Sequence, residues 1–303
     1  MNNVSNFVEG VDNAFVVILG ISLFFLIAIT MVMIWFVIKF SRKKNPKAKN
    51  VKEDMRLEVL WTVIPTILVL IMFYYGWVGY KGMREFPDDA MHVKATGRMW
   101  SWSFEYANGK VSPTLKVPVN TAVVLDLYSP DVLHSLYIPA FRIKEDVVPG
   151  VNNKMWFEAY EEGEYDILCA EYCGERHSFM LSKVEVMGEE SYNEWYGEDM
   201  SGADPIEAGL QVLQANGCTA CHSLNGSRLV GPSFKGLYGG TKDVLLEDGS
   251  KKSITADDEY IRRSIYEPNV EIVDTYPKVM ISYKQTINEE QLKQITAYLK
   301  SIK

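Results

Sequence analysis

The four cysteines fall in two close pairs, and each pair has a histidine within a few residues. The first pair belongs to CAEYCGERHSFM, which places Cys169, Glu171, Cys173, His177 and Met180 within twelve residues. Two thiolates, an imidazole and a thioether are soft ligands, and such a set favours copper because zinc makes little use of methionine. The segment therefore predicts a copper site, and its two cysteines allow a dinuclear centre.

A further nitrogen ligand has to come from another part of the chain. Of the four histidines, His222 belongs to a different motif and His92 is isolated, which leaves His134 in DVLHSLYIP as the candidate. Other interpretations stay open at this point. The two cysteines of the segment could form a disulfide or, with two histidines, hold structural zinc. Its methionine could belong to a core and its glutamate to the solvated surface.

The second pair forms the motif C-x-x-C-H at Cys218, Cys221 and His222. This motif is typical of covalent haem c, with both thiols attached to the haem and the imidazole on the iron, although C-x-x-C alone also occurs in thioredoxin-like and zinc sites. Met280 is the only methionine C-terminal to the motif, which makes it the candidate sixth ligand rather than a packing residue. An iron with six ligands carries electrons and does not activate oxygen.

Two long apolar segments must anchor these sites to a membrane. Residues 14–38 and 59–80 are uncharged, and each is long enough for a helix to cross the ~30 Å hydrocarbon core, which argues against buried helices of a soluble protein. The start of the chain has Glu9 and Asp12 but no basic residue, unlike a signal peptide. The basic loop 41–56 predicts a cytoplasmic loop with both termini on the outer side.

The remaining chain predicts two soluble domains. After a hairpin region 1–88, alternating strands with turn signals between them indicate an all-β sandwich over 89–188. Residues 189–203 are acidic, contain glycine and serine, and indicate a linker. Residues 204–303 predict an all-α domain, with helices beginning at Asp204-Pro205 and at Asn288. The strands are expected at 100–106, 123–128, 134–138, 154–160, 164–169 and 182–186.

The charge distribution excludes one class of partner. The chain has 39 acidic and 31 basic residues, and the net charge of −8 divides into +3 for residues 1–80, −10 for 81–200 and −1 for 201–303. A nucleic-acid partner is not expected, because no soluble domain offers a basic face. Long-range steering between the two soluble domains should be weak, and a linker of this length has a reach of roughly 20–25 Å.

Residues 1–190 closely resemble subunit II of the haem-copper cytochrome c oxidases, through LEVLWTVIPTILVL, GRMWSWSFEY and VLHSLYIPAFRIKEDVVPG. The resemblance implies a cupredoxin-like domain with a dinuclear CuA centre, in which two cysteine sulfurs bridge the coppers. It also implies a magnesium ion at the boundary with the catalytic subunit, reached by the same glutamate that offers its main-chain carbonyl to copper. The implied CuA ligands are His134, Cys169, Glu171, Cys173, His177 and Met180.

Two further residues receive roles from resemblance alone. Trp100, the first tryptophan of the aromatic segment, corresponds to the residue that admits electrons in this family, although a tryptophan in a sandwich also has a plain core role. Residues 204–303 resemble a class I monohaem cytochrome c. That resemblance makes His222 and Met280 the axial pair and gives the carbonyl of Pro232 a hydrogen bond from the axial histidine.

Together the resemblances imply subunit II of a caa-type oxidase in a bacterial inner membrane. Electrons from an upstream cytochrome c or a quinol:cytochrome c reductase-type complex are expected at the haem, then at CuA, then at haem in catalytic subunit I, where oxygen becomes water. Other oxidase subunits are further expected partners. Two alternatives remain at this stage: a subunit of a CuA-containing nitric oxide reductase, and a membrane-tethered electron carrier without an oxidase partner.

Overall fold

The computed structural model describes residues 3–47, 53–198 and 204–303. It separates into two compact units, Met1–Asp88 and Asp89–Lys303. Part of the expected linker, 199–203, and part of the expected cytoplasmic loop, 48–52, lie outside the described residues.

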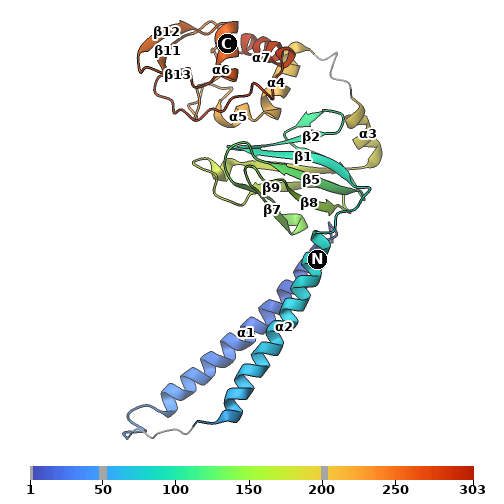
Figure 1. Cartoon of the computed structure of the whole chain (residues 1–303), viewed down its shortest axis with the longest axis vertical. Coiled ribbons are helices and arrows are strands. Elements are labelled where there is room, and N and C mark those ends of the chain that lie inside the picture. Colours follow the sequence, from blue (N-terminus) through green and yellow to red (C-terminus); the bar gives the residue numbers. More distant parts are fainter. Residues whose placement is uncertain (1–2, 48–52, 199–203) are drawn as a thin grey trace. The chain divides into compact units, whose positions relative to one another are not determined.

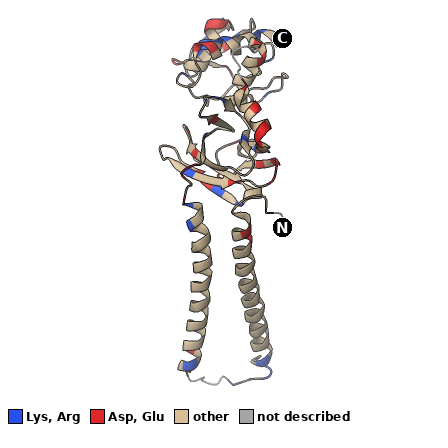
Figure 2. Cartoon of the chain, turned by 90° about the vertical axis from the view of Figure 1, so that its right-hand side faces the viewer, with Lys and Arg blue, Asp and Glu red and all other residues tan. Residues whose placement is uncertain are grey.

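The first unit is an antiparallel pair of long helices, α1 (Val8–Lys39) and α2 (Met55–Met83) (Figure 1). Their length and apolar composition suit a membrane span, and most of their large apolar side chains are exposed. Such exposure fits contact with lipid. The Asp54 carboxylate accepts a hydrogen bond from the Arg56 N–H and caps α2. Lys and Arg residues lie at the helix ends next to the connection between α1 and α2 (Figure 2).

The second unit begins with a sandwich of two five-stranded sheets. One sheet has the order β3-β2-β1-β5-β8, and the other has the order β4-β10-β9-β6-β7. β1 pairs with β5 and β4 with β10 in parallel, whereas the remaining pairs are antiparallel. The strands are β1 (Met91–Arg98), β2 (Ser101–Tyr106), β3 (Val111–Ser112), β4 (Leu115–Pro118), β5 (Ala122–Tyr128), β6 (His134–Ile138), β7 (Ile143–Val147), β8 (Asn153–Glu158), β9 (Gly163–Cys169) and β10 (Leu181–Met187).

Alternation along the strands builds the sandwich core. In β2, Trp102, Phe104 and Tyr106 are buried while the residues between them are not. Trp102 requires the glycine at position 97 in the paired strand, because a Cβ there would lie 2.7 Å from the indole ring. Two single-turn helices, Pro139–Phe141 and His177–Phe179, connect strands of the second sheet.

The expected linker is partly a helix. α3 (Glu189–Gly197) follows β10 directly and packs against the sandwich. The Tyr106 ring lies 5.0 Å from the Trp195 ring, measured between centroids. Lys110 Nζ donates to the Trp195 carbonyl, and the Asn108 side chain donates to the Tyr196 carbonyl at 2.9 Å. These contacts, which composition alone does not reveal, hold the nine residues of α3 on the sandwich.

The C-terminal domain surrounds a second core with four helices and a small sheet. α4 (Pro205–Ala215) packs on α7 (Glu289–Ser301) at a close crossing, with α5 (Cys218–Cys221) and α6 (Asp258–Tyr266) beside them. Asp204 caps α4, and Asn288 and Gln291 form the expected capping box of α7. Leu213, Leu292, Ile295 and Leu299 belong to the buried core.

The expectation of a purely helical C-terminal domain was incomplete. β11 (Thr241–Leu246), β12 (Lys251–Thr255) and β13 (Glu271–Val273) form a three-stranded antiparallel sheet in the order β12-β11-β13. The turn between β11 and β12 contains Asp248 and Gly249, and the glycine has a positive φ of 80°. An Asp-Gly pair between short alternating runs is a hairpin signal.

Candidate functional site

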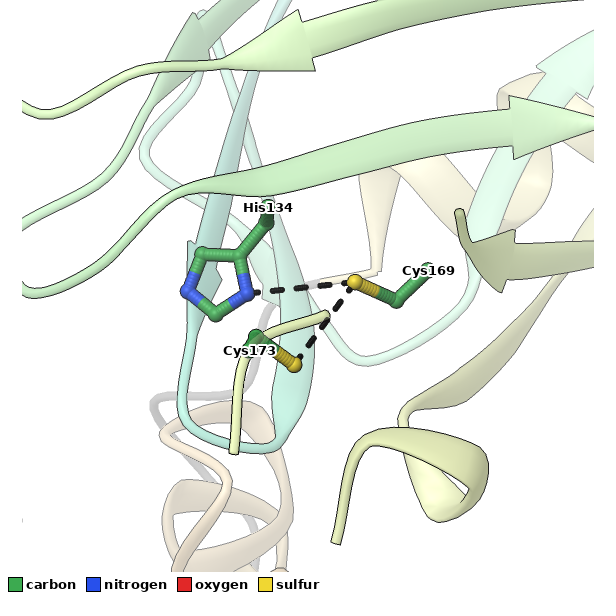
Figure 3. A group of neighbouring side chains, drawn as sticks. All are labelled: His134, Cys169 and Cys173. Carbon is green, nitrogen blue, oxygen red and sulfur yellow. Dashed lines mark hydrogen bonds between the residues drawn. The ribbon is translucent and has the colours of Figure 1, made fainter. Parts of the chain in front are cut away.

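The first site lies at one end of the second sheet, where β6 begins and β9 ends. The His134 imidazole and the Cys169 and Cys173 thiols point toward one another (Figure 3). The Cys169 Sγ lies 4.0 Å from His134 Nδ1 and 3.7 Å from Cys173 Sγ. Both cysteines are free thiols, and a disulfide would need a separation of about 2.05 Å.

The remaining candidate ligands lie on the loop after β9. The Cys173 Sγ is 3.5 Å from His177 Nδ1 and 3.7 Å from Met180 Sδ. The main-chain carbonyl of Glu171 lies 3.2 Å from Cys169 Sγ. The structure thus brings donor atoms of all six sequence-predicted copper ligands, the sixth being His134, around two sulfurs.

Backbone hydrogen bonds give this ligand loop its shape. Ala170 N–H donates to the Ser135 carbonyl at 2.9 Å and extends the pairing of β9 with β6 beyond the last strand residue. Cys169 N–H donates to the Met180 carbonyl at 3.3 Å, and Met180 N–H donates to the His177 carbonyl at 3.1 Å. These backbone hydrogen bonds close the loop at both ends.

A buried carboxylate orients the histidine at the start of β6. Asp131 Oδ1 lies 2.9 Å from His134 Nε2, and Asp131 Oδ2 accepts the Met99 N–H at 2.8 Å. Because Nε2 is engaged by the carboxylate, Nδ1 faces the two thiols as the free ligand nitrogen. The Trp102 ring packs edge-on to the same imidazole, 6.1 Å between centroids.

The two thiols differ in acidity. Burial would raise the pKa of Cys169, but hydrogen bonding to His134 and to backbone groups lowers it to about 6. Burial and the neighbouring Cys169 sulfur raise the pKa of Cys173 to about 12. Two sulfurs this close resist carrying two negative charges, so a cation between them is needed to hold both as thiolates.

Buried sulfurs and imidazoles of this kind fit copper. Met180 and His134 are completely buried and both cysteines nearly so. Thiolate and thioether donors select copper among common metals, and zinc has little use for the methionine. Glu171 is half-buried, and the metal-ligand cluster found among the described residues, His134 with Cys169 and Cys173, contains no carboxylate.

Trp100 lies directly beside this centre. Its indole Nε1 donates to the Cys173 carbonyl at 3.2 Å, and its side chain is buried. Gly174 has a φ of 120°, and a Cβ there would lie 3.2 Å from the indole. The loop can therefore approach Trp100 closely only because residue 174 is glycine.

The second site is a cavity in the C-terminal domain. Cys218, Cys221, His222 and Met280 all line it, together with apolar side chains from α4, α6 and α7. The space not filled by atoms, including the open mouth, is about 1330 Å³. Two thiols, an imidazole and a thioether around a large apolar cavity fit a covalently attached haem with two axial ligands.

Contacts at Nδ1 and at one ring face fix the imidazole of His222. Its Nδ1 lies 2.7 Å from the Pro232 carbonyl, and its ring stacks on Phe234 with centroids 4.5 Å apart. A Cβ on Gly231 would lie 2.5 Å from the imidazole, so the chain passes close behind the ring. Burial lowers the pKa of His222. A neutral imidazole with Nδ1 engaged leaves Nε2 for iron.

Sequence reasoning missed several residues that support these ligands. Asp131, Gly174, Gly231 and Phe234 touch ligand-bearing segments, but the sequence alone assigned none of them a role, although Asp131 and Gly174 lie within the two copper-ligand segments. Asp131 had the only local signal, because an acidic residue three positions before a ligand histidine can orient its ring. The other three depend on chain approaches that only the folded structure defines.

Comparison with known families assigns each region separately. Residues 2–76 match the cytochrome c oxidase subunit II transmembrane domain, and 109–187 match the periplasmic domain of that subunit. Residues 206–303 match cytochrome c.

Individual relatives cover most of the chain. Cytochrome c oxidase subunit 2 of Alkalihalophilus pseudofirmus is 32% identical in an alignment of 310 positions, which covers 94% of this chain and 86% of the relative. The subunit 2 of Cereibacter sphaeroides is 27% identical and covers 66% of this chain and 78% of its own. The solved periplasmic domain of subunit II from Bradyrhizobium japonicum is 32% identical, with a TM-score of 0.35, over 37% of this chain and 94% of that structure.

Proposed function

The chain belongs to the cytochrome c oxidase subunit II family with a fused cytochrome c domain, and from this premise we propose that it accepts electrons at the cytochrome domain for a haem-copper oxidase. When bound, haem c and the copper pair supply one-electron chemistry, which connects an upstream cytochrome or quinol:cytochrome c reductase-type complex to oxygen reduction in catalytic subunit I. The observation that carries the proposal is the convergence of four further donors, namely two imidazoles, a thioether and a main-chain carbonyl, on two buried sulfurs.

The copper centre is proposed to use every donor that surrounds the sulfurs. Cys169 and Cys173 would hold copper through their thiolates, His134 and His177 through imidazole Nδ1, and Met180 and the Glu171 carbonyl would be weaker donors. The closed ligand loop and the Asp131 carboxylate support this assignment, because both fix ligand positions without help from the metal. Rigid ligands keep the rearrangement on oxidation and reduction small, which favours fast electron transfer.

The haem is proposed to bind through Cys218 and Cys221, with His222 and Met280 on the iron. The common cavity supports this assignment, as does the Pro232 carbonyl that engages the opposite nitrogen of the imidazole. A methionine ligand together with a histidine would raise the reduction potential of the haem relative to two histidines.

Trp100 is proposed to connect the two sites. It donates to the carbonyl of bridging Cys173, and its side chain also lines the cavity that holds the haem-motif residues. The indole is therefore both a wall of the haem site and a direct hydrogen-bond partner of the copper loop. A role as plain sandwich core does not require either contact.

Two finer features complete the proposal. The Glu171 carboxylate is proposed to reach a magnesium ion at the boundary with the catalytic subunit, because its main chain already lies at the copper site and the residue is half-buried. The basic connection 41–56 is proposed to be cytoplasmic and both termini periplasmic, as the excess of Lys and Arg in that connection indicates.

The proposal is tested with the full chain in its complex. Cys173→Ser should abolish the mixed-valence paramagnetic signal of a copper pair and lower the copper content, while the covalent haem remains. Phe179→Leu, on an exposed ring of the same loop, is the matched control and should keep both. A copper-pair signal that survives Cys173→Ser would refute the assignment, as would wild-type protein that contains zinc in place of copper.

A further inference from the structure

The copper domain contacts the haem motif at a small surface that the sequence motifs did not predict. Arg176, on the copper-ligand loop, donates through Nη1 to the carbonyl of Ala220, which lies between the two cysteines of the haem motif. Gly217, just before the motif, lies against Ser101 of β2 so closely that a Cβ would be 1.9 Å from Ser101 Oγ. Both contacts join the segment that carries one site to the segment that carries the other.

A second arginine reinforces this surface. The Arg98 guanidinium at the end of β1 lies 5.1 Å from the ring centroid of Tyr283 in the cytochrome domain. Arg98 is 8% exposed, and its Nε is a buried donor without a partner in the described structure. A buried arginine is expensive unless it has a specific role, and the aromatic face supplies one.

The contacts across this surface involve carbonyl, aromatic and glycine groups rather than carboxylates. Among the described residues, no ion pair joins the sandwich to the C-terminal domain, although the copper region carries a net charge of −10. Contacts of this type depend on close fit and are screened by salt much less than exposed ion pairs.

The chain connection restricts how far the two domains can separate. The helix α3 is attached to the sandwich as far as Gly197, and α4 begins at Pro205. Whatever conformation residues 199–203 adopt, the steps from Glu198 to Asp204 span at most about 20–22 Å when fully extended. Asp204, at the start of α4, therefore stays within about 20–22 Å of Glu198, at the end of α3, even when the contacts between the two domains break.

We propose that Arg98, Ser101 and Arg176 form a docking face for the haem-motif segment 217–221, which holds the fused cytochrome as a fixed electron donor in one orientation. The inference rests on the proposed function and adds to it the residues that position donor and acceptor. Arg98 and Arg176 are positioning residues, since neither contacts a ligand atom of the copper site.

Substitution at Gly217 gives the sharpest test because a matched glycine is available. Gly217→Ala places a methyl group on Ser101, whereas Gly236→Ala has a similar positive φ, 65° against 70°, with nothing within 4 Å. Both alanines carry the same backbone strain, so a difference between them reports the contact. Adding Ser101→Gly to Gly217→Ala removes both clashing atoms and should restore docking.

Two measurements on the full oxidase are compared for each variant. Hydrogen exchange of amides 217–221 reports docking, and the oxidation rate of flash-reduced haem c reports transfer to copper. Gly217→Ala should lower both the protection of these amides against exchange and the haem oxidation rate by about tenfold or more. Gly236→Ala should keep both within about twofold of wild type, and the double variant should recover both. In wild type, both should change less than about twofold between low and high salt.

Arg176→Gln provides an independent arm if the alanine at 217 impairs haem attachment. It should lower protection of 217–221 by about tenfold, because a charge-assisted hydrogen bond is lost, while covalent haem and the copper-pair signal stay normal. Wild-type protection and rate in Arg176→Gln would overturn the docking face, as would a wild-type rate that collapses with salt. Wild-type haem that never reduces copper would instead refute the proposed function.

Discussion

The close crossing of α4 and α7 should require glycine at position 209, because any larger side chain would meet α7. An ideal Cβ at Gly209 would lie 2.1 Å from the Gln294 carbonyl oxygen, 2.6 Å from its carbon and 2.8 Å from Tyr298 Cβ. Ordinary contacts begin at 3.4 Å, so Gly209→Ala requires the two helices to separate by roughly 1 Å. Two of these obstacles are backbone atoms, which cannot rotate away.

The magnitude follows from two opposing effects. Overpacking of a well-ordered contact costs about 1–3 kcal/mol or more, while alanine gains up to about 1 kcal/mol of helix propensity over glycine. Because the obstructing atoms belong to the backbone, we take the upper value of the overpacking cost, about 3 kcal/mol. Subtracting the gain in helix propensity leaves a net loss of about 2 kcal/mol in unfolding free energy. For a domain of this size, that lowers the melting temperature by about 8–16 °C.

The assay is thermal unfolding of the haem-loaded chain, followed by the haem absorption band. Gly197→Ala is the helical control, because a Cβ at the end of α3 meets nothing within 4 Å and should be neutral or slightly stabilising. Because α4 leads directly to Cys218, the variant should also shift the haem environment. A Gly209→Ala protein that melts at or above the wild-type temperature would refute the close-crossing argument.

Three other predictions concern the sandwich and the haem. Burial alone would raise the pKa of Asp126, but hydrogen bonds from His92 and Lys154 lower it, so these hydrogen bonds stabilise the folded domain. This stabilisation is present above the unfolded pKa of about 3.9 and is lost as the pH falls through the folded pKa. Asp126→Asn should therefore make unfolding of the copper domain less dependent on pH in acid, and an unchanged acid unfolding curve would contradict this. Trp195→Ala removes aromatic contacts of about 0.5–1.5 kcal/mol each and should speed limited proteolysis within 189–198 by about tenfold, whereas Tyr172→Ala, on an exposed ring, should not. Met280→His should lower the haem reduction potential in a redox titration, and an unchanged potential would remove Met280 from the iron.

The parts of the molecule that the sequence predicted are those set by local patterns. The ligand loop CAEYCGERHSFM and the haem motif contain their donors within a few residues, and the strand at 134–138 matches β6 at both ends. Uncharged runs identified both long helices, which extend a few residues beyond the expected spans. In each case the signal and the structure involve neighbours along the chain.

The parts that escaped prediction depend on contacts between distant segments. α3 is acidic and contains glycine at its end, so composition indicated a linker, yet its aromatic face packs on β2 and its carbonyls accept from Asn108 and Lys110. The close approach of Gly217 to Ser101 spans more than a hundred positions and leaves no trace in either local sequence. The sheet β11–β13 is different, because the Asp-Gly turn at 248–249 was a readable signal.

Because α3 packs on the sandwich, the connection to the cytochrome domain is shorter than the sequence predicted. Of residues 189–203, nine belong to α3, which is held on the sandwich, so the connection that remains is less than half of the expected length. Effective concentration rises roughly as the inverse three-halves power of linker length, which gives about a fourfold increase over the full fifteen-residue segment. At such concentrations, a few contacts without ion pairs are enough to keep the cytochrome domain docked. Strong charge complementarity is then unnecessary for the proposed electron transfer from a nearly neutral cytochrome domain to an acidic copper domain.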